Sequence, residues 1–318
     1  SNSGSILILE ATDAGLAIEL EIVGRPEDDQ LSAVGYDGHG SLLIRAVAGD
    51  DGASWFGGID LSRRQEGIGF ELAEWVSVDP RGRTGLGQHF VRWDADGDGT
   101  LEMLLSGWLD YENSGTVSWY SPSEGAPALE GTLVSNDIEG VNLGYSMTTA
   151  RGLVEPDADA LVVGGYLAST VGFGRHGLVW VLGSPLVDGM DVSEAYTTIE
   201  GPPAGFFGWA LSPPVDLNQD GVQDVVVGAP GDPYASTGEG QVYVFLGPFA
   251  AGVLSVDDAD LTIRGDCLGD RFGQSVGIGD LDGDRWPDLV VGAEGNSSRA
   301  VGGGAIYFFE GSGLQDAL

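Results

Sequence analysis

The chain has 318 residues, and its 49 Asp and Glu residues against 13 Arg and no Lys give a formal net charge of −36. A surface this acidic repels nucleic acid and anionic lipid and favours cations, so we expect no nucleic-acid partner. No apolar run approaches the ~18 residues of a membrane-spanning helix, so no direct membrane insertion is expected. The single cysteine, Cys267, excludes an intramolecular disulfide.

Short segments of the sequence recur at intervals of 62 to 64 residues. Each copy of the clearest segment is a glycine followed by alternating β-branched and aromatic residues, which is typical of a β-strand. In chain order the copies are GASWFG from Gly52, GTVSWY from Gly115, GLVWVL from Gly177, GQVYVF from Gly240 and GAIYFF from Gly304. Three further series of apolar runs share the period, so each repeat holds about four strands, and no segment has a convincing helical period.

Repeats of four short strands predict an all-β fold, a β-propeller of four-stranded antiparallel blades in a single domain. We expect five blades, from repeats at residues 25–75, 76–135, 136–200, 201–264 and 265–318. The segment AIELEIVG at 17–24 resembles the segments that supply the fourth strand of other repeats. We therefore expect it to complete the last blade and leave no open sheet edge. The alternative is a fragment of a seven-bladed ring.

An acidic nonapeptide recurs three times at the same place in the repeats. The copies are DADGDGTLE at 94–102, DLNQDGVQD at 216–224 and DLDGDRWPD at 280–288. Each has Asp at position 1, Asp or Asn at 3, Asp at 5 and an acid at 9. Asp, Asn and Gly also favour ordinary solvated turns, but like charges this close repel, and three loops in register indicate a shared cation. Six to eight oxygen ligands suit Ca²⁺, to which a backbone carbonyl at position 7 would contribute.

The order of an FG pair, an acidic loop and a GAP-like strand resembles the FG-GAP repeat of the integrin α-subunit β-propeller. The stretches at 207–230 and 272–294 carry this resemblance most clearly. It implies calcium in hairpin loops between the first and second strands of three blades, hence three ions. The implied ligands are the side chains of Asp94, Asp96, Asp98, Glu102, Asp216, Asn218, Asp220, Asp224, Asp280, Asp282, Asp284 and Asp288, with the carbonyls of Thr100, Val222 and Trp286.

The sequence departs from the family pattern in three ways. Integrin heads have seven repeats, whereas five are found here. Arg285 stands where Gly is usual at position 6, which bears on the backbone turn of the third loop. The equivalent segments at 35–43 and 152–160 lack the ligand spacing, so we expect no strong calcium site there. An EF-hand is excluded because the last acid comes at position 9 and the flanking segments are strands.

Other motifs are interpreted as structural. The RGD tripeptide at Arg264–Asp266 falls where the repeat itself requires Gly-Asp, and the sequon at Asn296 matters only in a secreted eukaryotic protein. The histidines (His39, His89 and His176) and Cys267 show no convergence that predicts a zinc site or a nucleophile. Four tryptophans near loops are candidates to line a sugar site: Trp55, Trp108, Trp209 and Trp286.

We therefore predict a monomeric, non-enzymatic module for adhesion that binds calcium and presents its blade loops to a protein or glycan ligand. Short calcium loops outside a helix pair resemble extracellular modules, whose dissociation constants for calcium are roughly 10⁻⁴–10⁻³ M. We therefore expect the protein outside the cell, at its surface or in the periplasm, with its signal peptide removed. The alternative is a glycosidase-type enzyme, which needs two carboxylates ~5–9.5 Å apart. The unassigned acids for that role are Asp50, Asp51, Asp110 and Asp232.

Overall fold

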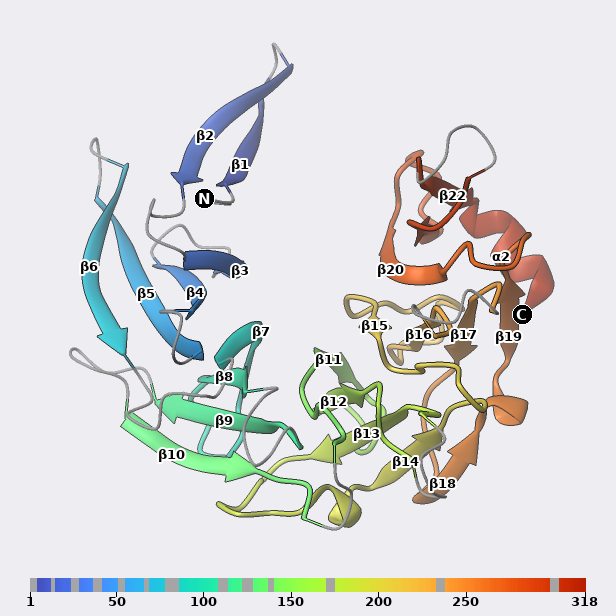
Figure 1. Cartoon of the computed structure of the whole chain (residues 1–318), viewed down its shortest axis with the longest axis horizontal. Coiled ribbons are helices and arrows are strands. Elements are labelled where there is room, and N and C mark those ends of the chain that lie inside the picture. The colour runs from blue at the N-terminus through green and yellow to red at the C-terminus, as the bar shows by residue number, and fades with distance from the viewer. Residues whose placement is uncertain are drawn as a thin grey trace.

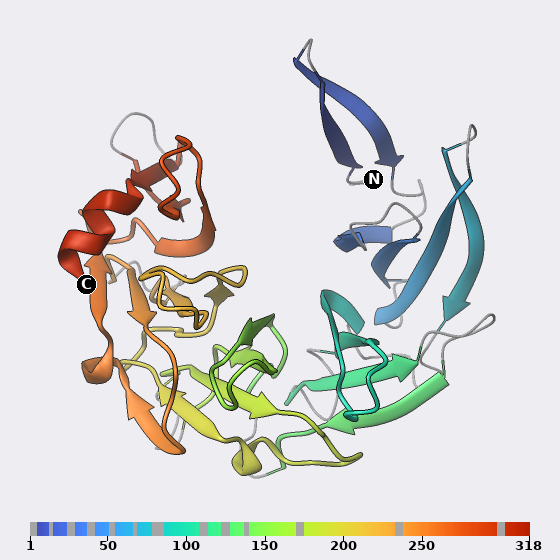
Figure 2. The ribbon, with the colours of Figure 1, turned by 180° about the vertical axis from the view of Figure 1, so that it is seen from behind.

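The computed structural model describes residues 5–12, 15–23, 29–36, 42–50, 55–65, 69–77, 86–107, 114–121, 128–136, 140–169, 175–232, 238–297 and 303–318, with side chains from residue 89 onward. The described residues are mainly strands. A hairpin and five larger sheets follow one another along a curved arc, as Figure 1 shows from one side and Figure 2 from behind.

The N-terminal hairpin pairs β1 (Ser5–Thr12) with β2 (Gly15–Val23). The first sheet holds β3 (Asp29–Tyr36), β4 (Leu42–Asp50), β5 (Trp55–Gln65) and β6 (Gly69–Ser77). The second sheet holds β7 (Leu86–Trp93), β8 (Glu102–Gly107), β9 (Thr116–Ser121) and β10 (Ala128–Leu133).

The third sheet holds β11 (Ser146–Arg151), β12 (Asp159–Gly165), β13 (Leu178–Gly183), β14 (Thr197–Glu200) and β18 (Gly252–Ser255). The fourth holds β15 (Ala210–Leu211), β16 (Val225–Ala229), β17 (Gln241–Phe245) and β19 (Leu261–Arg264). The fifth holds β20 (Phe272–Gly279), β21 (Asp288–Ala293) and β22 (Ala305–Phe309). Among the described residues, the helical elements are the short 3₁₀ turns η1 (Val192–Glu194) and η2 (Val256–Asp258) and the helix α2 (Gly311–Ala317).

The predicted all-β class and antiparallel sheets are confirmed, and each of the five glycine-led segments leads into the third strand of a sheet, namely β5, β9, β13, β17 and β22. The expectation of uniformly antiparallel, four-stranded sheets is wrong in two places. Strand β18 crosses back from the fourth repeat and pairs in parallel with β14, which makes a five-stranded sheet. The fifth sheet has three described strands. No segment has a clear helical period in the sequence, yet residues 311–317 form α2, whose Leu314 is buried against the fifth sheet.

The hydrophobic core lies between successive sheets, because side chains of a strand point alternately to its two faces. Strand β13 shows this alternation. Its Trp180 and Leu182 belong to the core shared by the second and third sheets. Its Val179 and Val181 belong to the core shared by the third and fourth sheets. A third core joins the fourth and fifth sheets. Strands β13 and β17 therefore each pack against the sheets on both sides of them.

The glycines that precede β9, β13 and β17 permit a close backbone contact with the next repeat. Gly240 forms a parallel bridge with Phe272 of the following FG motif, and its φ of +84° lies in the left-handed region. A Cβ atom at Gly240 would collide with the backbone of Phe272. Glycine is required there both for its backbone conformation and for its missing side chain.

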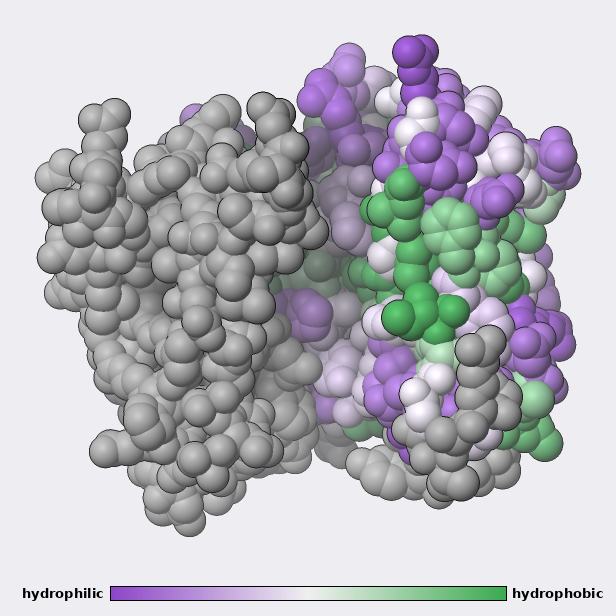
Figure 3. All heavy atoms as spheres, turned by 90° about the horizontal axis from the view of Figure 1, so that it is seen from above, coloured by the Kyte–Doolittle hydropathy of each residue, from purple (hydrophilic) through white to green (hydrophobic). Residues whose placement is uncertain are grey.

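Hydrophobic side chains also remain on the surface of the last sheet. Figure 3 shows them gathered on the face seen from above, over the part of the molecule that contains the fifth sheet. Ile306 and Phe308 of β22 are 79% and 48% exposed. Among the described helices, none is long and apolar enough to cross a membrane.

The contact between sheets at Gly240 gives the first prediction. Gly240→Ala should lower the free energy of unfolding by ~3 kcal/mol, because it combines a steric clash with a left-handed backbone. Gly277→Ala in β20 is the matched control, since a Cβ atom there meets no atom within 4 Å. Urea unfolding curves measure both. Equal stability of the two variants would contradict the close contact.

Candidate metal centre

The three acidic loops each join the first and second strands of a sheet. Residues 94–102 lie between β7 and β8, 216–224 between β15 and β16, and 280–288 between β20 and β21. The acid at position 9 stands at the start of the second strand in each case. Its side chain is buried: Glu102, Asp224 and Asp288 are 1%, 2% and 0% exposed.

Backbone amides fold the first loop around its own carboxylates. Asp94 accepts hydrogen bonds from the N–H groups of Gly97 (2.8 Å) and Gly99 (3.0 Å). Asp96 accepts from the next odd position, Asp98 (3.0 Å). Glu102 reaches back across the loop and accepts from the Ala95 N–H (2.7 Å). The carboxylates therefore line the inside of a tight turn.

The second loop has a similar pattern, in which the N–H of position 5 replaces that of position 4. Asp216 accepts from the N–H groups of Asp220 (3.1 Å) and Gly221 (2.9 Å), and Asn218 accepts from Asp220 through its side-chain oxygen (3.1 Å). The buried Asp224 accepts from Leu217 (2.7 Å) within the loop.

The third loop has the same hydrogen-bond pattern as the first loop. Asp280 accepts from the N–H groups of Gly283 (2.7 Å) and Arg285 (3.0 Å), and Asp288 accepts from Leu281 (2.8 Å). Arg285 has a φ of +77°, close to the +90° of Gly99 and the +94° of Gly221. The third loop therefore keeps the backbone turn of the others, although arginine rarely adopts this conformation.

Three carboxylates converge in two of the loops. One oxygen from each of Asp94, Asp96 and Glu102 lies within 4.8 Å of the others. The same holds for one oxygen from each of Asp280, Asp282 and Asp288. Positions 1, 3 and 9 are thus brought together. The second loop has an amide, Asn218, at position 3 in place of a third carboxylate.

The acids at position 5 have a different immediate role. Asp98, Asp220 and Asp284 accept hydrogen bonds from the N–H groups of position 7, which belong to Thr100 (2.6 Å), Val222 (2.8 Å) and Trp286 (2.8 Å). Asp98 and Asp284 lie outside the two groups of converging carboxylates. Their ligand role, and that of the carbonyls of position 7, stays a prediction.

The electrostatics of the loops disfavour buried negative charge. Burial raises the pKa of the Asp224 carboxyl to about 6; the charges of Asp220 and Asp216 act in the same direction, while the N–H groups of Gly247 and Leu217 oppose it. Burial likewise raises the pKa of Glu102. A bound cation would remove this penalty by neutralising the carboxylates.

The buried acids also accept hydrogen bonds from a later part of their own repeats. The Gly247 N–H donates to Asp224 (3.0 Å), and the Gly311 N–H donates to Asp288 (2.8 Å). Between adjacent loops, the Gln219 side chain donates to the Arg285 carbonyl (3.1 Å). The second and third loops therefore contact each other across two adjacent repeats.

The degenerate segment at 152–160 folds differently. Its Gly152 N–H donates to the Ala158 carbonyl (2.8 Å), and Asp157 forms an exposed ion pair with Arg151 (3.4 Å). It shows neither the amide pattern nor the converging carboxylates of the other loops. In the segment at 35–43, residues 37–41 lie outside the described part of the chain.

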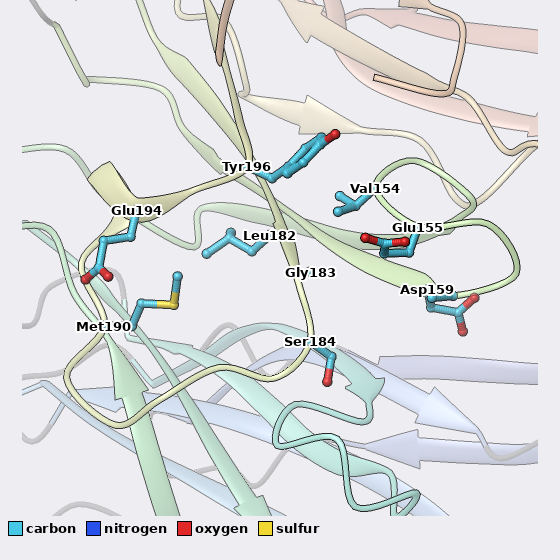
Figure 4. Close-up of a pocket in the computed structure, with 10 residues that line it drawn as sticks. Val154, Glu155, Asp159, Leu182, Gly183, Ser184, Met190, Glu194 and Tyr196 are labelled. Carbon is cyan, nitrogen blue, oxygen red and sulfur yellow. The ribbon is translucent and has the colours of Figure 1, made fainter. Parts of the chain in front are cut away.

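A pocket of about 230 Å³ opens beside this degenerate segment. Its acids, Glu155, Asp159 and Glu194, come from two different parts of the third repeat, and Tyr196 adds a hydroxyl. Figure 4 shows the apolar side chain of Leu182 between Glu155 and Glu194. The sequence analysis missed this pocket, since its residues follow no repeat pattern.

The structure buries the sequon asparagine. Asn296 is 4% exposed, and its side-chain nitrogen donates to Asp270 (2.8 Å) and to the Tyr307 hydroxyl (3.2 Å). The same hydroxyl donates to Asp266 of the RGD tripeptide (3.2 Å). Both motifs therefore take part in one hydrogen-bond network of the fifth repeat, which supports their structural interpretation.

An aromatic cluster between the third and fourth repeats was not predicted as a unit. The Tyr145 ring lies 4.4 Å from Tyr166 and 4.9 Å from Trp209, between ring centroids. The sequence does contain a pattern that predicts this cluster, because Tyr145 and Trp209 both follow the glycine of an FG-type motif. His89 lies 6.4 Å from Tyr145, and burial lowers its pKa to about 4, so it is neutral near pH 7. The side chains of Trp55 and Trp108 lie outside the described residues.

The raised pKa of Asp224 gives a prediction for calcium binding. Because binding requires the ionised carboxylate, the calcium affinity of the second loop should fall as the pH drops below about 6. With a chelator present, the pH dependence of folding stability has the opposite sign. Ionised Asp224 destabilises the fold fully above about pH 6, and this destabilisation disappears as the pH falls towards 3.8. Asp224→Asn should remove this group's share of the pH dependence in chelator. Calorimetric calcium titrations and thermal melts between about pH 7.5 and pH 5 measure both effects. If the calcium affinity of the second loop did not depend on pH, Asp224 would not be a calcium ligand with a raised pKa.

Comparison with known proteins supports the repeat assignment. A family model described as the FG-GAP repeat matches residues 207–245 and 272–309, which contain the second and third acidic loops. Human phosphatidylinositol-glycan-specific phospholipase D is 36% identical over 187 residues, covering 55% of this chain and 21% of that protein. Mouse integrin α-IIb is 42% identical over 99 residues (30% of this chain, 9% of the integrin), and rat integrin α-7 is 40% identical over 95 residues (29% and 8%).

The matched regions thus span about a fifth of the phospholipase and less than a tenth of each integrin. The family resemblance inferred from the FG pairs, acidic loops and GAP-like strands is confirmed. Residues 207–245 and 272–309 carry FG-GAP repeats, and the chain is similar to integrin α chains over part of its length.

Proposed function

We propose that the chain is a five-bladed propeller that binds three calcium ions and serves, outside the cytoplasm, as a non-enzymatic module for binding a protein or glycan. The observation that carries the proposal is the repeated convergence of acids in the hairpin loops. Two loops gather three carboxylates within 4.8 Å, and all three share one pattern of amide hydrogen bonds.

The residues present fit a calcium ion. Calcium accepts six to eight hard oxygen ligands at ~2.3–2.6 Å in a flexible shell, whereas magnesium demands a smaller octahedron. Positions 1, 3, 5 and 9 supply side-chain oxygens, and position 7 would add a carbonyl. When bound, calcium neutralises the loop carboxylates. The side chains then connect the end of the first strand to the buried start of the second.

The place of the loops in the fold suggests what calcium does for the protein. Asp224 and Asp288 accept hydrogen bonds from segments that follow a third strand, and Gln219 joins two neighbouring loops. Ordered loops would hold adjacent sheets in register. A rigid propeller can then present its connecting loops to a ligand.

Two arguments support a binding module outside the cytoplasm. The curated relatives include integrin α chains. Short loops of this kind resemble extracellular modules with dissociation constants of roughly 10⁻⁴–10⁻³ M, which fill at millimolar calcium.

The calcium proposal predicts three ions per chain in millimolar calcium, measured by metal analysis after equilibrium dialysis. Each site adds ~2.7 kcal/mol of stability at a hundredfold excess over its dissociation constant, so a chelator should lower the melting temperature markedly. Asp220→Ala should remove about one ion, whereas Asp257→Asn, an exposed acid outside the loops, is the matched control.

The number of ions distinguishes the outcomes of that measurement. A ratio near zero, with a melting curve unmoved by chelator, would show that the loops are acidic turns. A ratio near five would show that the segments at 35–43 and 152–160 also bind. Ligand binding itself is tested on glycan and matrix-protein arrays, where calcium-dependent capture is expected.

The alternative is a glycan-active enzyme, and two observations favour it. One relative is a phosphatidylinositol-glycan-specific phospholipase D, and the pocket in Figure 4 brings acids together around an apolar surface. Assays on glycans and on phosphatidylinositol-glycan anchors decide between the two. Turnover that is lost in Glu155→Gln and Glu194→Gln, but kept in the exposed control Glu130→Gln, would establish the enzyme. We expect no turnover.

A further inference from the structure

The segment that follows the third strand of a sheet reaches back to the preceding repeat. After β13, the Leu186 N–H donates to the carbonyl of Ala95 in the first acidic loop (2.6 Å). After β17, the Phe249 N–H donates to the carbonyl of Leu153 in the degenerate segment (2.9 Å). Both acceptors stand at position 2 of their nine-residue segments, and both are 0% exposed. The same contact therefore recurs between successive repeats.

After β22, the helix α2 makes this contact through a side chain. The side-chain nitrogen of Gln315 donates to the carbonyl of Leu217, which stands at position 2 of the second acidic loop. Leu314 of the helix and Leu217 are both buried in the core that joins the fourth and fifth sheets. Helix α2, coloured red in Figures 1 and 2, is thus attached to a loop of the preceding repeat.

The first turn of α2 is attached to the third acidic loop. The Gly311 N–H donates to Oδ1 of Asp288 (2.8 Å), while Oδ2 of Asp288 accepts from Leu281 within the loop (2.8 Å). A Cβ atom at Gly311 would lie 2.6 Å from Cβ of Trp286, so the helix begins in close contact with the loop. Asp288 also supplies one of the three converging carboxylates. One carboxylate therefore belongs both to the candidate metal centre and to the start of the helix.

The helix has little stability of its own. It has seven residues, GSGLQDA, and two of them are glycines, which are poor helix formers. Isolated helices shorter than ~12–15 residues are marginal in water. The N-cap residue, Glu310, makes no side-chain hydrogen bond that would cap the helix. The contacts with the two loops and the burial of Leu314 are therefore what keep this segment helical.

An acidic loop without a cation is a poor support for the helix. Oxygens of Asp280, Asp282 and Asp288 lie within 4.8 Å of one another, and their charges repel. Separation of these carboxylates displaces Asp288 and breaks its hydrogen bond with Gly311. The second loop transmits the same effect, because the Leu217 N–H donates to the buried acid at position 9, Asp224 (2.7 Å).

We propose that calcium in the second and third loops controls the docking of α2. The helix is docked across the fourth and fifth repeats when the loops are filled, and it unfolds and leaves them when they are empty. This inference rests on the proposed function, since it requires the loops to bind calcium. It adds a conformational response: a chain segment outside the loops whose structure reports their occupancy.

Hydrogen exchange of the full chain, followed by mass spectrometry, tests the proposal. The N–H groups of Leu314 and Leu318 donate within the helix (3.1 and 3.0 Å). At a temperature below the melting point in chelator, they should exchange roughly tenfold or more slowly in millimolar calcium than in chelator. The internal control is β17, whose Val242 and Val244 are 0% and 1% exposed. Its amides should be equally protected in both conditions.

Two variants separate docking from helix formation. Gln315→Ala removes the hydrogen bond to Leu217 and should speed the exchange of α2 in calcium by roughly fivefold. The matched control is Ser312→Ala, at an exposed position of the same helix, which should leave the exchange rate in calcium unchanged. Gly313→Ala should slow the exchange in chelator, because alanine favours a helix and a Cβ atom there meets no atom within 4 Å.

Three outcomes would overturn the proposal, and metal analysis of the same samples distinguishes them. Equal exchange of α2 in calcium and in chelator, with three ions bound, would leave the calcium sites standing and exclude the coupling. Loss of protection in β17 together with α2 would show that chelation unfolds whole repeats. Absence of bound calcium would overturn the proposed function and this inference together.

Discussion

The packing of the third strands β13 and β17 against the sheets on both sides of them is the interaction on which the rest of the structure depends. Strand β13 places Trp180 and Leu182 in one core and Val179 and Val181 in the next, so the third sheet buries both of its faces against neighbouring sheets. Close contacts such as that between Gly240 and Phe272 fix the distance between repeats. Repeat proteins are stabilised in this way, because each unit buries its apolar face only against the next unit. It also accounts for the exposure of Ile306 and Phe308, because none of the described sheets packs on that face of β22.

The acidic loops add an electrostatic constraint within each sheet, and the hydrogen bond from Gln219 to the Arg285 carbonyl joins the second and third loops across adjacent repeats. Their ninth residues are buried and accept hydrogen bonds from segments of the sheet's own third-strand connection, as Asp224 does from Gly247 and Asp288 from Gly311. Buried carboxylates that repel one another destabilise the fold unless a cation neutralises them. Filling the loops with calcium would convert this repulsion into a stabilising contact at the joints between sheets. A binding module that works at millimolar calcium would then be rigid only where that calcium is present.

Much of the fold could be predicted because its signals are local and repeated. The glycine-led strands and the acidic loops depend on alternation and spacing within one repeat, and the structure places both where the sequence predicted. Features set by contacts between repeats escaped prediction. Residues 252–255 give no strand pattern of their own, and they become β18 only because the edge of β14 is available. Arg285 breaks the glycine rule, yet its N–H still donates to Asp280, so the turn survives. The burial of Asn296 depends on Asp270 and Tyr307, which no local pattern relates to it.

The central claim is that three of the hairpin loops are calcium sites and the two degenerate segments are not. The most direct measurement is a crystal structure of the chain grown in millimolar calcium, with anomalous scattering used to locate the ions. The account predicts one calcium peak in each of the loops at 94–102, 216–224 and 280–288, surrounded by the side chains of positions 1, 3, 5 and 9 and the carbonyl of position 7. The claim would be contradicted if the three loops showed no anomalous peak at that concentration. It would also be contradicted if equal peaks appeared at 35–43 and 152–160.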